Sequence, residues 1–307
     1  MTRSALPCAL WLVVSACAPA IVVPPASAVA RTERTAREVE LCVLTQESGI
    51  KPAFNGVAEF SGADWKFAIA SIAVKHPSAG LLIIDPAFGT TIGEDLARGG
   101  PMLMAAMGTA KGKRALVDVM ADAGLSPSDV QYAVMTHTHW DHIGALGDLP
   151  NAKILIARTE LGWTTPFTQY MDHGVMTHHL KRAKQNLWAF DFKGPPLDGF
   201  DASFDLFGDG SVVAVPLPGH TPGSTAFLVR GANGVTWLFS GDATWTSRGV
   251  ELPAHKMLRA FDDDLEVLSS TIGRLKAFSL NRPDVKVIPA HDGAALAQLP
   301  ECAPGRR

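Results

Sequence analysis

The sequence has few cysteines. It contains 4 in 307 residues, and since Cys8 and Cys17 fall in the N-terminal segment, only Cys42 and Cys302 remain, at the two ends of the rest of the chain. The sequence leaves open whether these two thiols form a disulfide or stay unpaired, because a disulfide requires a Cα separation of about 5.5 Å that sequence does not reveal. This cysteine usage is compatible with an exported protein.

The sequence also lacks a basic patch. Its formal net charge is -3, and no run of Lys and Arg is interleaved with aromatic residues, which excludes nucleic acid as an expected partner. The 47% of hydrophobic and 19% of charged residues are ordinary for a globular protein and argue against disorder. A chain of this length can bury one large core, so we expect one domain over residues 31–307. We also expect a helical insertion in this domain at about 159–200.

The first 30 residues lack the uninterrupted stretch of about 20 apolar residues that a bilayer-spanning helix needs. Arg3 precedes an apolar run that ends at Val23 and is broken by Pro7 and Pro19. The small-residue segment P-P-A-S-A-V-A then leads into the charged segment R-T-E-R. This order predicts a secretory signal peptide over residues 1–30.

Two cleavage sites fit this signal peptide. Cleavage after A-V-A, directly before Arg31, would release a soluble protein. The segment V-S-A-C at 14–17 instead resembles a bacterial lipobox, which would leave a lipid anchor at Cys17. We therefore expect a periplasmic or secreted protein, soluble or lipid-anchored, with no transmembrane segment after the signal peptide is removed.

Apolar runs followed by polar residues recur along the chain. Apolar residues at helical spacing predict helices over 114–124 and 262–280, and the N-G pair at 233–234 predicts a hairpin. Runs rich in Val, Ile, Ala and Leu predict strands at 39–45, 66–75, 81–84, 132–136, 151–157, 212–217, 225–230, 236–240 and 285–290. This mixture of strands and helices predicts an α/β fold.

The segment H-T-H-W-D-H directly follows one of these predicted strands. It places His137, His139, Asp141 and His142 within six positions, whereas no serine lies in a G-x-S-x-G nucleophile elbow. In an extended segment the first two histidines share a face and can bind one ion, while Asp141 and His142 lie past the turn and face a second position. Imidazole and carboxylate together suit zinc or a similar metal, so this pattern favours a metal site over a crowded polar turn.

Four residues cannot saturate two ions, so further ligands are expected at other strand ends. His220, Asp242 and His291 each follow a predicted strand directly or within a few residues. A single Asp or His in such a place is often a turn former or a cap. Three of them together favour completion of a metal site.

The motifs H-T-H-W-D-H, P-G-H-T-P-G-S, S-G-D-A and P-A-H-D, in this order, resemble the metallo-β-lactamase superfamily over roughly residues 39–295. The resemblance implies a four-layer αββα sandwich with a two-metal site at the common edge of both sheets. It assigns one ion to His137, His139 and His220, the other to Asp141, His142 and His291, and a bridging position to Asp242. It also places Asp85, in D-P-A-F-G, where it would orient a ligand histidine from behind.

The resemblance also indicates a branch of the superfamily. True β-lactamases lack the bridging aspartate, so Asp242 makes β-lactamase activity unexpected. The 22 residues from His220 to Asp242, the long 142–220 segment and the H-T-P-G-S loop resemble the acyl-homoserine lactonase group. Glyoxalase II and organophosphate hydrolases share the ligands, although the sequence shows no basic helical domain after His291 for glutathione.

This resemblance predicts a metallo-hydrolase with two divalent ions, expected to be Zn(II), which supply a bridging hydroxide while Asp141 and Asp242 take part in catalysis. The expected reaction is the opening of a small-molecule lactone such as an N-acyl-homoserine lactone, that is, quorum quenching. An organophosphate triester, an ester or a thioester is the alternative substrate. A metal-holding binding or regulatory protein is the non-enzymatic alternative, and the resemblance leaves a homodimer open.

The sequence departs from the lactonase pattern at Trp245, where those enzymes have a tyrosine three residues after the bridging aspartate. Tyr170 is the main candidate for a replacement hydroxyl, with Tyr132 the only other tyrosine. Together with Trp245 and Tyr170, Trp163 and Phe167 are candidate walls of the substrate pocket, with a place in the core as the alternative. His173, His178 and His179 are expected to be surface residues rather than a third metal site.

Overall fold

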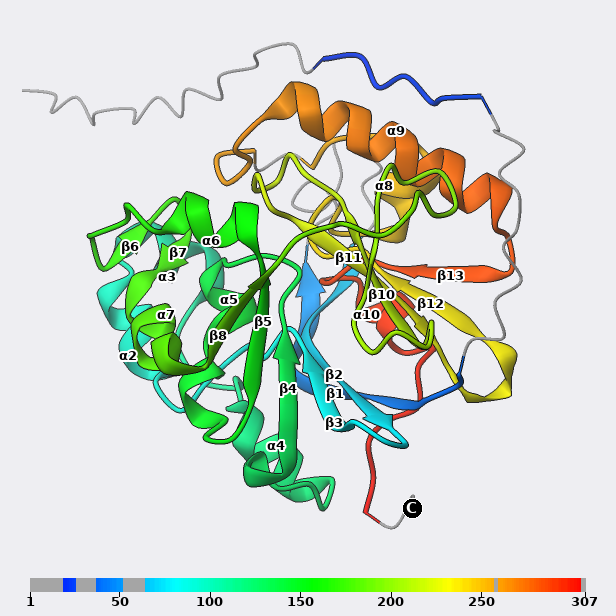
Figure 1. Ribbon diagram of the computed structural model, residues 1–307. Coiled ribbons are helices and arrows are strands. Elements are labelled where there is room, and N and C mark those ends of the chain that lie inside the picture. The colour runs from blue at the N-terminus through cyan, green and yellow to red at the C-terminus, as the bar shows by residue number, and fades with distance from the viewer. Residues whose placement is uncertain (1–18, 26–36, 52–63, 257–258, 305–307) are drawn as a thin grey trace, which may run out of the picture.

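The computed structural model describes residues 19–25, 37–51, 64–256 and 259–304 (Figure 1). Cys17, both candidate cleavage sites and most of the expected signal peptide lie outside these residues. Within the described ranges, no helix is long and apolar enough to cross a membrane.

The first sheet has six strands in the order β1-β2-β3-β4-β5-β8. They are β1 (Glu40–Lys51), β2 (Trp65–His76), β3 (Gly80–Ile84), β4 (Val130–Val134), β5 (Lys153–Ala157) and β8 (Leu187–Phe190). The pairs β1–β2 and β2–β3 are antiparallel, whereas β3, β4, β5 and β8 run parallel to one another. The carboxyl ends of these parallel strands therefore meet at one edge of the sheet, where α/β proteins commonly carry their ligands.

The second sheet has five strands in the order β13-β12-β11-β10-β9. They are β9 (Phe204–Asp205), β10 (Val212–Pro216), β11 (Thr225–Arg230), β12 (Thr236–Phe239) and β13 (Val285–Ile288). All neighbours are antiparallel except β12 and β13. The expected hairpin lies between β11 and β12, and Gly234 takes the positive φ of 72° that its turn requires.

Helices cover the outer faces of both sheets and connect the strands. They are α2 (Ile92–Arg98), α3 (Pro101–Met107), α4 (Leu116–Asp122), α5 (Trp140–Ile143), α6 (Arg158–Thr164), α7 (Thr177–Ala183), α8 (Ser247–Glu251), α9 (Leu265–Asn281) and α10 (Gly293–Leu296). Short 3-10 turns occupy Pro127–Asp129, Leu146–Asp148, Lys184–Asn186 and Ala232–Gly234, and a small hairpin joins β6 (Met171–Asp172) and β7 (Val175–Met176). In Figure 1, α9 lies over the second sheet, whereas α4, α6 and α7 lie on the opposite side of the molecule.

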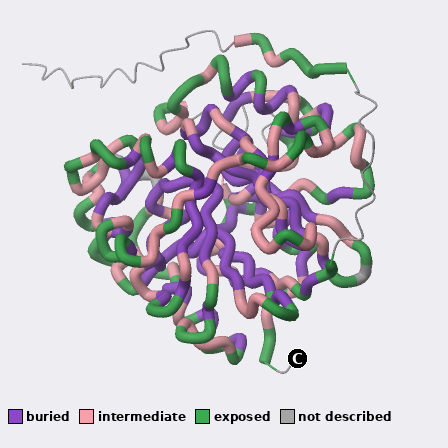
Figure 2. The backbone as a smooth tube through the Cα atoms, in the orientation of Figure 1, coloured by how far each residue is buried: buried purple, intermediate pink, exposed green. Residues whose placement is uncertain are grey.

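Apolar cores hold these layers together. Leu82 of β3 and Phe227 of β11 belong to the core between the two sheets, whose strands are largely buried (Figure 2). The next residue along β3, Ile83, packs instead with Met120 of α4 on the other face of the first sheet. Leu268 and its neighbours on α9 cover the second sheet. The expected four-layer αββα sandwich is therefore confirmed, and β3 is buried on both faces as its continuous apolar run indicated.

The segment expected to be a helical insertion is only partly helical. It contains α6 and α7, but residues 187–190 form β8, which pairs parallel to β5 at the edge of the first sheet. The stretch L-W-A-F is too short for its periodicity to distinguish a helix from a strand, and pairing with β5 decides the outcome. The helices α2 and α3 were not predicted.

Cys42 and Cys302 form a disulfide with a Cα separation of 4.9 Å. Cys42 lies in β1, and Cys302 lies near the end of the described chain, where its backbone N–H donates to the carbonyl of Val43. The disulfide therefore fastens the C-terminal segment to the edge strand of the first sheet, which decides between the two alternatives that the sequence left open.

Candidate metal centre

The seven residues expected as metal ligands all come together in the structure. They follow four strands of the two sheets: β4, β10, β12 and β13. Three groups have ligand atoms within 4.8 Å of one another: His137, His139 and His220; His137, His142 and Asp242; and Asp141, His142 and His291. Each loop leaves its sheet at the common edge, which is why residues up to 154 positions apart in sequence become neighbours.

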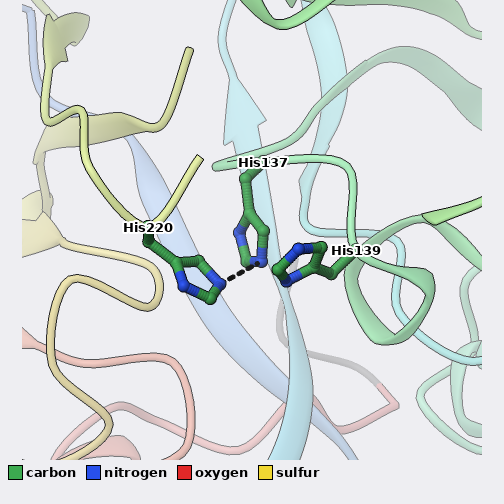
Figure 3. A group of neighbouring side chains, drawn as sticks. All are labelled: His137, His139 and His220. Atoms are coloured by element: carbon green, nitrogen blue, oxygen red, sulfur yellow. Dashed lines mark hydrogen bonds between the residues drawn. The ribbon is translucent and has the colours of Figure 1, made fainter. Parts of the chain in front are cut away.

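Three histidines form the first group. Figure 3 shows the rings of His137 and His139, from one loop, converging with that of His220 from another. The Nε2 atoms of His137 and His220 are 3.1 Å apart, and all three residues are buried. Burial, reinforced by the charges of the neighbouring histidines, lowers the pKa of His137 and of His139 well below the ordinary value. The neutral imidazole is the form that binds a metal ion.

The group of Asp141, His142 and His291 lies beside a further carboxylate, that of Asp242. His142 Nε2 lies 3.4 Å from Asp242 Oδ1, and His291 Nε2 lies 3.2 Å from Asp242 Oδ2 and 3.6 Å from Asp141 Oδ2. Burial lowers the pKa of His142, but the charges of the surrounding carboxylates outweigh burial and hold this pKa well above its ordinary value. Burial also lowers the pKa of His291, and the charge of Asp242 outweighs it in the same way, so that this pKa is raised.

Asp242 contacts both groups. Its Oδ2 atom lies 3.6 Å from His220 Nε2 as well as 3.2 Å from His291 Nε2. Burial would raise the pKa of Asp242, but the charges of His291 and His142 hold it well below the ordinary value, so the carboxylate is ionised. An anion shared by two histidine groups is what a bridging ligand requires.

Several buried polar atoms of the centre have no hydrogen-bond partner among the described residues. They include His139 Nε2, His142 Nε2 and Asp242 Oδ1. Buried polar atoms are seldom left unpaired in native proteins, and ions that bind imidazole nitrogen and carboxylate oxygen would satisfy these three atoms. The residues present therefore fit divalent metal ions.

Asp85 forms a hydrogen bond with His142 through the ring nitrogen that does not face the centre. Its Oδ2 atom is 3.0 Å from His142 Nδ1, and its two oxygens accept hydrogen bonds from the backbone N–H and the hydroxyl of Thr136. Asp85 takes a positive φ of 50°, directly after β3, and the hydroxyl of Ser71 donates to its carbonyl. This is the placement that the sequence resemblance implied for Asp85.

A corresponding pair that no sequence pattern predicted, Asp262 and Lys256, lies beside the Nδ1 atom of His220. Asp262 Oδ1 lies 2.7 Å from His220 Nδ1 and also accepts a hydrogen bond at 2.5 Å from Lys256 Nζ. Lys256 is fully buried and donates to the carbonyl of Asp242 as well. No sequence signal identified Asp262, because it opens an ordinary D-D-D run, in which Asp264 caps α9.

Glu160 was also missed. This buried carboxylate accepts hydrogen bonds from the backbone N–H and hydroxyl of Thr138, from the hydroxyl of Thr221 and from the N–H of Gly223. Thr138 lies between His137 and His139, and Thr221 follows His220. Glu160 therefore links the two loops that carry the three-histidine group. The sequence could not reveal this role, because the two loops become neighbours only in the folded chain.

A largely apolar pocket opens onto the centre. Its wall includes Phe67, Leu103, Met107 and Met171, and the ligands His139, Asp141, His220, Asp242 and His291 lie in its lining. Trp245 also lines the pocket, as the sequence led us to expect, and its indole N–H donates to Asp242 Oδ2 at 2.7 Å.

The other aromatic candidates for the pocket wall lie elsewhere. Trp163 and Phe167 pack with the core that covers the outer face of the first sheet. Tyr170 directs its hydroxyl to Asp95, and Tyr132 packs between the sheets beside Phe207. Neither of the two tyrosines of the chain is among the lining residues of the pocket.

The three histidines expected at the surface have different environments. The side chain of His173 is 62% exposed, as expected. The expectation is wrong for His179, which is fully buried, and His178 is only partly exposed. Asp95 of α2 faces both rings, and Tyr170 stacks on that of His178. Sequence periodicity did not reveal these contacts because α2 itself was not predicted.

Comparison with known proteins identifies the family of this chain. The model of the Metallo-beta-lactamase superfamily matches residues 66–291. The N-acyl homoserine lactonase AttM of Agrobacterium fabrum is 28% identical over 242 residues, which are 78% of this chain and 87% of AttM.

Solved structures of similar fold include an N-acyl homoserine lactone hydrolase with its product N-hexanoyl-L-homoserine bound at the catalytic metal centre. It aligns with a TM-score of 0.63 at 18% identity and covers 86% of this chain and 98% of that one. AidC, a dizinc quorum-quenching lactonase, aligns with a TM-score of 0.56 at 16% identity over 83% and 88% of the two chains. The chain therefore belongs to the metallo-β-lactamase superfamily and is a metallo-hydrolase.

Proposed function

We propose that this enzyme opens the ring of a lactone that carries an apolar acyl chain, such as an N-acyl-homoserine lactone. The observation that carries the proposal is the largely apolar pocket that opens onto the ligand residues. A pocket of this kind suits an acyl chain whose polar head reaches the metal centre. The relatives named as N-acyl homoserine lactonases support the same substrate class.

The seven ligand residues are proposed to hold two divalent ions, with zinc favoured by the mixture of imidazole and carboxylate. His137, His139 and His220 would hold one ion, Asp141, His142 and His291 the other, and Asp242 would contact both. When bound, two such ions lower the pKa of water enough to supply hydroxide near neutral pH and stabilise negative charge that develops on a substrate oxygen.

The residues of the chain position these ligands and the substrate. Asp85 and Asp262 fix the rings of His142 and His220 from behind, so that each Nε2 atom faces the centre. Trp245 fixes the carboxylate of Asp242. The carboxylates of Asp141 and Asp242 would hold the ions and accept a proton during the reaction. Phe67, Leu103, Met107 and Met171 would contact the acyl chain and exclude water from it.

Hydrolysis rates with a defined substrate test this proposal. The protein from Arg31 onward, loaded with zinc, would be assayed by pH-stat with a long-chain N-acyl-homoserine lactone, and Asp242→Asn would serve as the inactive reference. We expect metal-dependent opening that the variant loses. If the enzyme holds two ions and does not turn over this lactone, the proposed substrate is wrong, and phosphotriesters and thioesters would be assayed on the same preparation.

We further propose that the enzyme acts outside the cytoplasm. The Cys42–Cys302 disulfide supports this location, since such bonds persist in oxidising compartments. Mass spectrometry of the mature N-terminus would distinguish a start at Arg31 from a lipidated Cys17. A mature chain that keeps Met1 would contradict export through this signal.

A further inference from the structure

A second cluster of potential metal ligands lies apart from the seven residues of the metal centre. Asp95 comes from α2, and His178 and His179 come from the first turn of α7. Asp95 Oδ1 is 3.0 Å from His178 Nε2, and Asp95 Oδ2 is 3.2 Å from His179 Nε2. One ligand atom from each residue lies within 4.8 Å of the other two, which is the spacing of a shared ion.

The cluster is largely closed to solvent. Asp95 and His179 are 1% and 0% exposed, and the ring of Tyr170 stacks on that of His178 with centroids 4.8 Å apart. His179 makes no hydrogen bond of regular geometry with the described residues: Nδ1 has no partner, and Nε2 only lies beside the carboxylate of Asp95. A fully buried imidazole without a hydrogen bond is costly unless something else binds it.

The carboxylate of Asp95 accepts hydrogen bonds from two hydroxyl groups, as the carboxylate ligands of metal sites commonly do. The hydroxyl of Tyr170 donates to Asp95 Oδ1 at 3.0 Å, and that of Thr91 donates to Oδ2 at 2.9 Å. Such outer hydrogen bonds orient the carboxylate of a metal site and restrict its rotation. They also account for Tyr170, whose hydroxyl is directed away from the catalytic pocket.

We propose that Asp95, His178 and His179 bind one divalent transition-metal ion, separate from the catalytic centre. Two imidazoles and one carboxylate are a ligand set that zinc accepts. When bound, the ion would join α2 to α7 in a cluster that is largely closed to solvent. Both helices adjoin the pocket wall: the N–H of Gly99 donates to the carbonyl of Asp95, and Gly99, Met171 and Gly174 line the pocket.

Metal content per chain tests the proposal without an activity assay. Protein reconstituted with zinc and freed of excess ion would be measured by inductively coupled plasma mass spectrometry. Asp95→Asn and His178→Gln should each bind one ion fewer than the wild type, whatever the total. His173→Gln is the matched control, because it removes an exposed histidine from the hairpin that precedes α7, and it should leave the count unchanged.

A combined variant separates this site from the catalytic one. Adding Asp95→Asn to Asp242→Asn should remove one further ion, which would hold even if the proposed lactonase function failed. Circular dichroism would verify that each variant is folded, and His178→Gln decides the matter if Asp95→Asn does not fold, since His178 is partly exposed. Equal metal content in the wild type and a folded His178→Gln variant would overturn the proposal.

Discussion

Trp245 donates its indole N–H to Asp242 Oδ2 at a distance of 2.7 Å. The same ring meets His291 edge-on, with centroids 5.8 Å apart. Trp245 therefore steadies one carboxylate and one imidazole of the centre, whereas a tyrosine at this position would present a hydroxyl. The residue that departs from the lactonase pattern has a positioning task of its own.

Trp245→Phe removes this N–H and keeps an aromatic ring. Loss of an outer hydrogen bond to a metal ligand commonly lowers metal affinity or activity about 10- to 100-fold. We expect kcat to fall by about tenfold, at the low end of that range, because Asp242 keeps its other partners. Steady-state kinetics of the zinc-loaded enzyme check this, with Trp188→Phe as control, since Trp188 is exposed. An unchanged kcat would show that the indole N–H is dispensable.

Asp85→Asn should weaken binding of the ion assigned to His142. Asparagine tolerates the positive φ of Asp85, so the fold is expected to survive, but a neutral amide orients His142 less firmly. The dissociation constant of that ion should rise by about 10- to 100-fold, as measured by competition with a chromophoric chelator. Asp209→Asn is the matched control, because Asp209 likewise pairs with a histidine, His76, away from the centre. Equal affinities in both variants would remove the proposed role of Asp85.

The two ion positions should respond differently to pH. The pKa values of His142 and His291 are raised, so these rings bind protons that a metal ion must displace, and affinity at their position should decline as pH falls through these pKa values. The pKa values of His137 and His139 are lowered, so their position should retain its ion to a lower pH.

Calorimetric titration of metal-free protein with zinc, in two buffers of different ionisation enthalpy, would count the protons released. Near neutral pH the ion at His142 and His291 should release more protons than the ion at His137 and His139. Identical proton release for both ions would contradict this assignment.

Glu160→Gln should destabilise the metal-free protein. Thr138, Thr221 and Gly223 all donate hydrogen bonds to this carboxylate. Glutamine has an NH2 group in place of one carboxylate oxygen, so a donor of the side chain would face a donor of the loops. Leaving buried donors unsatisfied costs about 1–3 kcal/mol, which urea denaturation would measure as a lower free energy of unfolding. Glu94→Gln, an exposed position in α2, should have almost no effect. A loss no larger than that of Glu94→Gln would mean that the two histidine loops do not depend on Glu160.

The ligands could be predicted from sequence because each obeys a local rule. His137, Asp242 and His291 follow apolar runs that predict strands, and the carboxyl ends of β4, β12 and β13 meet at the common edge of the two sheets. Asp262 and Glu160 obey no such rule, since the first belongs to a helix-capping run and the second to the start of a helix. Their tasks arise only from the way loops meet in three dimensions.

The environments of the aromatic and histidine residues in the 159–190 segment could not be predicted from the sequence either. Spacing alone does not tell a core residue from a pocket residue, and Trp163 and Phe167 pack in the core while Met171 lines the pocket. His179 is buried and faces Asp95, a contact between two short helices of weak sequence signal.

The disulfide between Cys42 and Cys302 closes a covalent ring that contains all seven ligand residues and every strand of both sheets except the first two residues of β1. A protease that cuts one peptide bond inside this ring opens the ring but frees no fragment. A nicked enzyme would therefore still migrate as a single species until a reductant is added, and every metal ligand would stay tethered to the others while the cut ends separate.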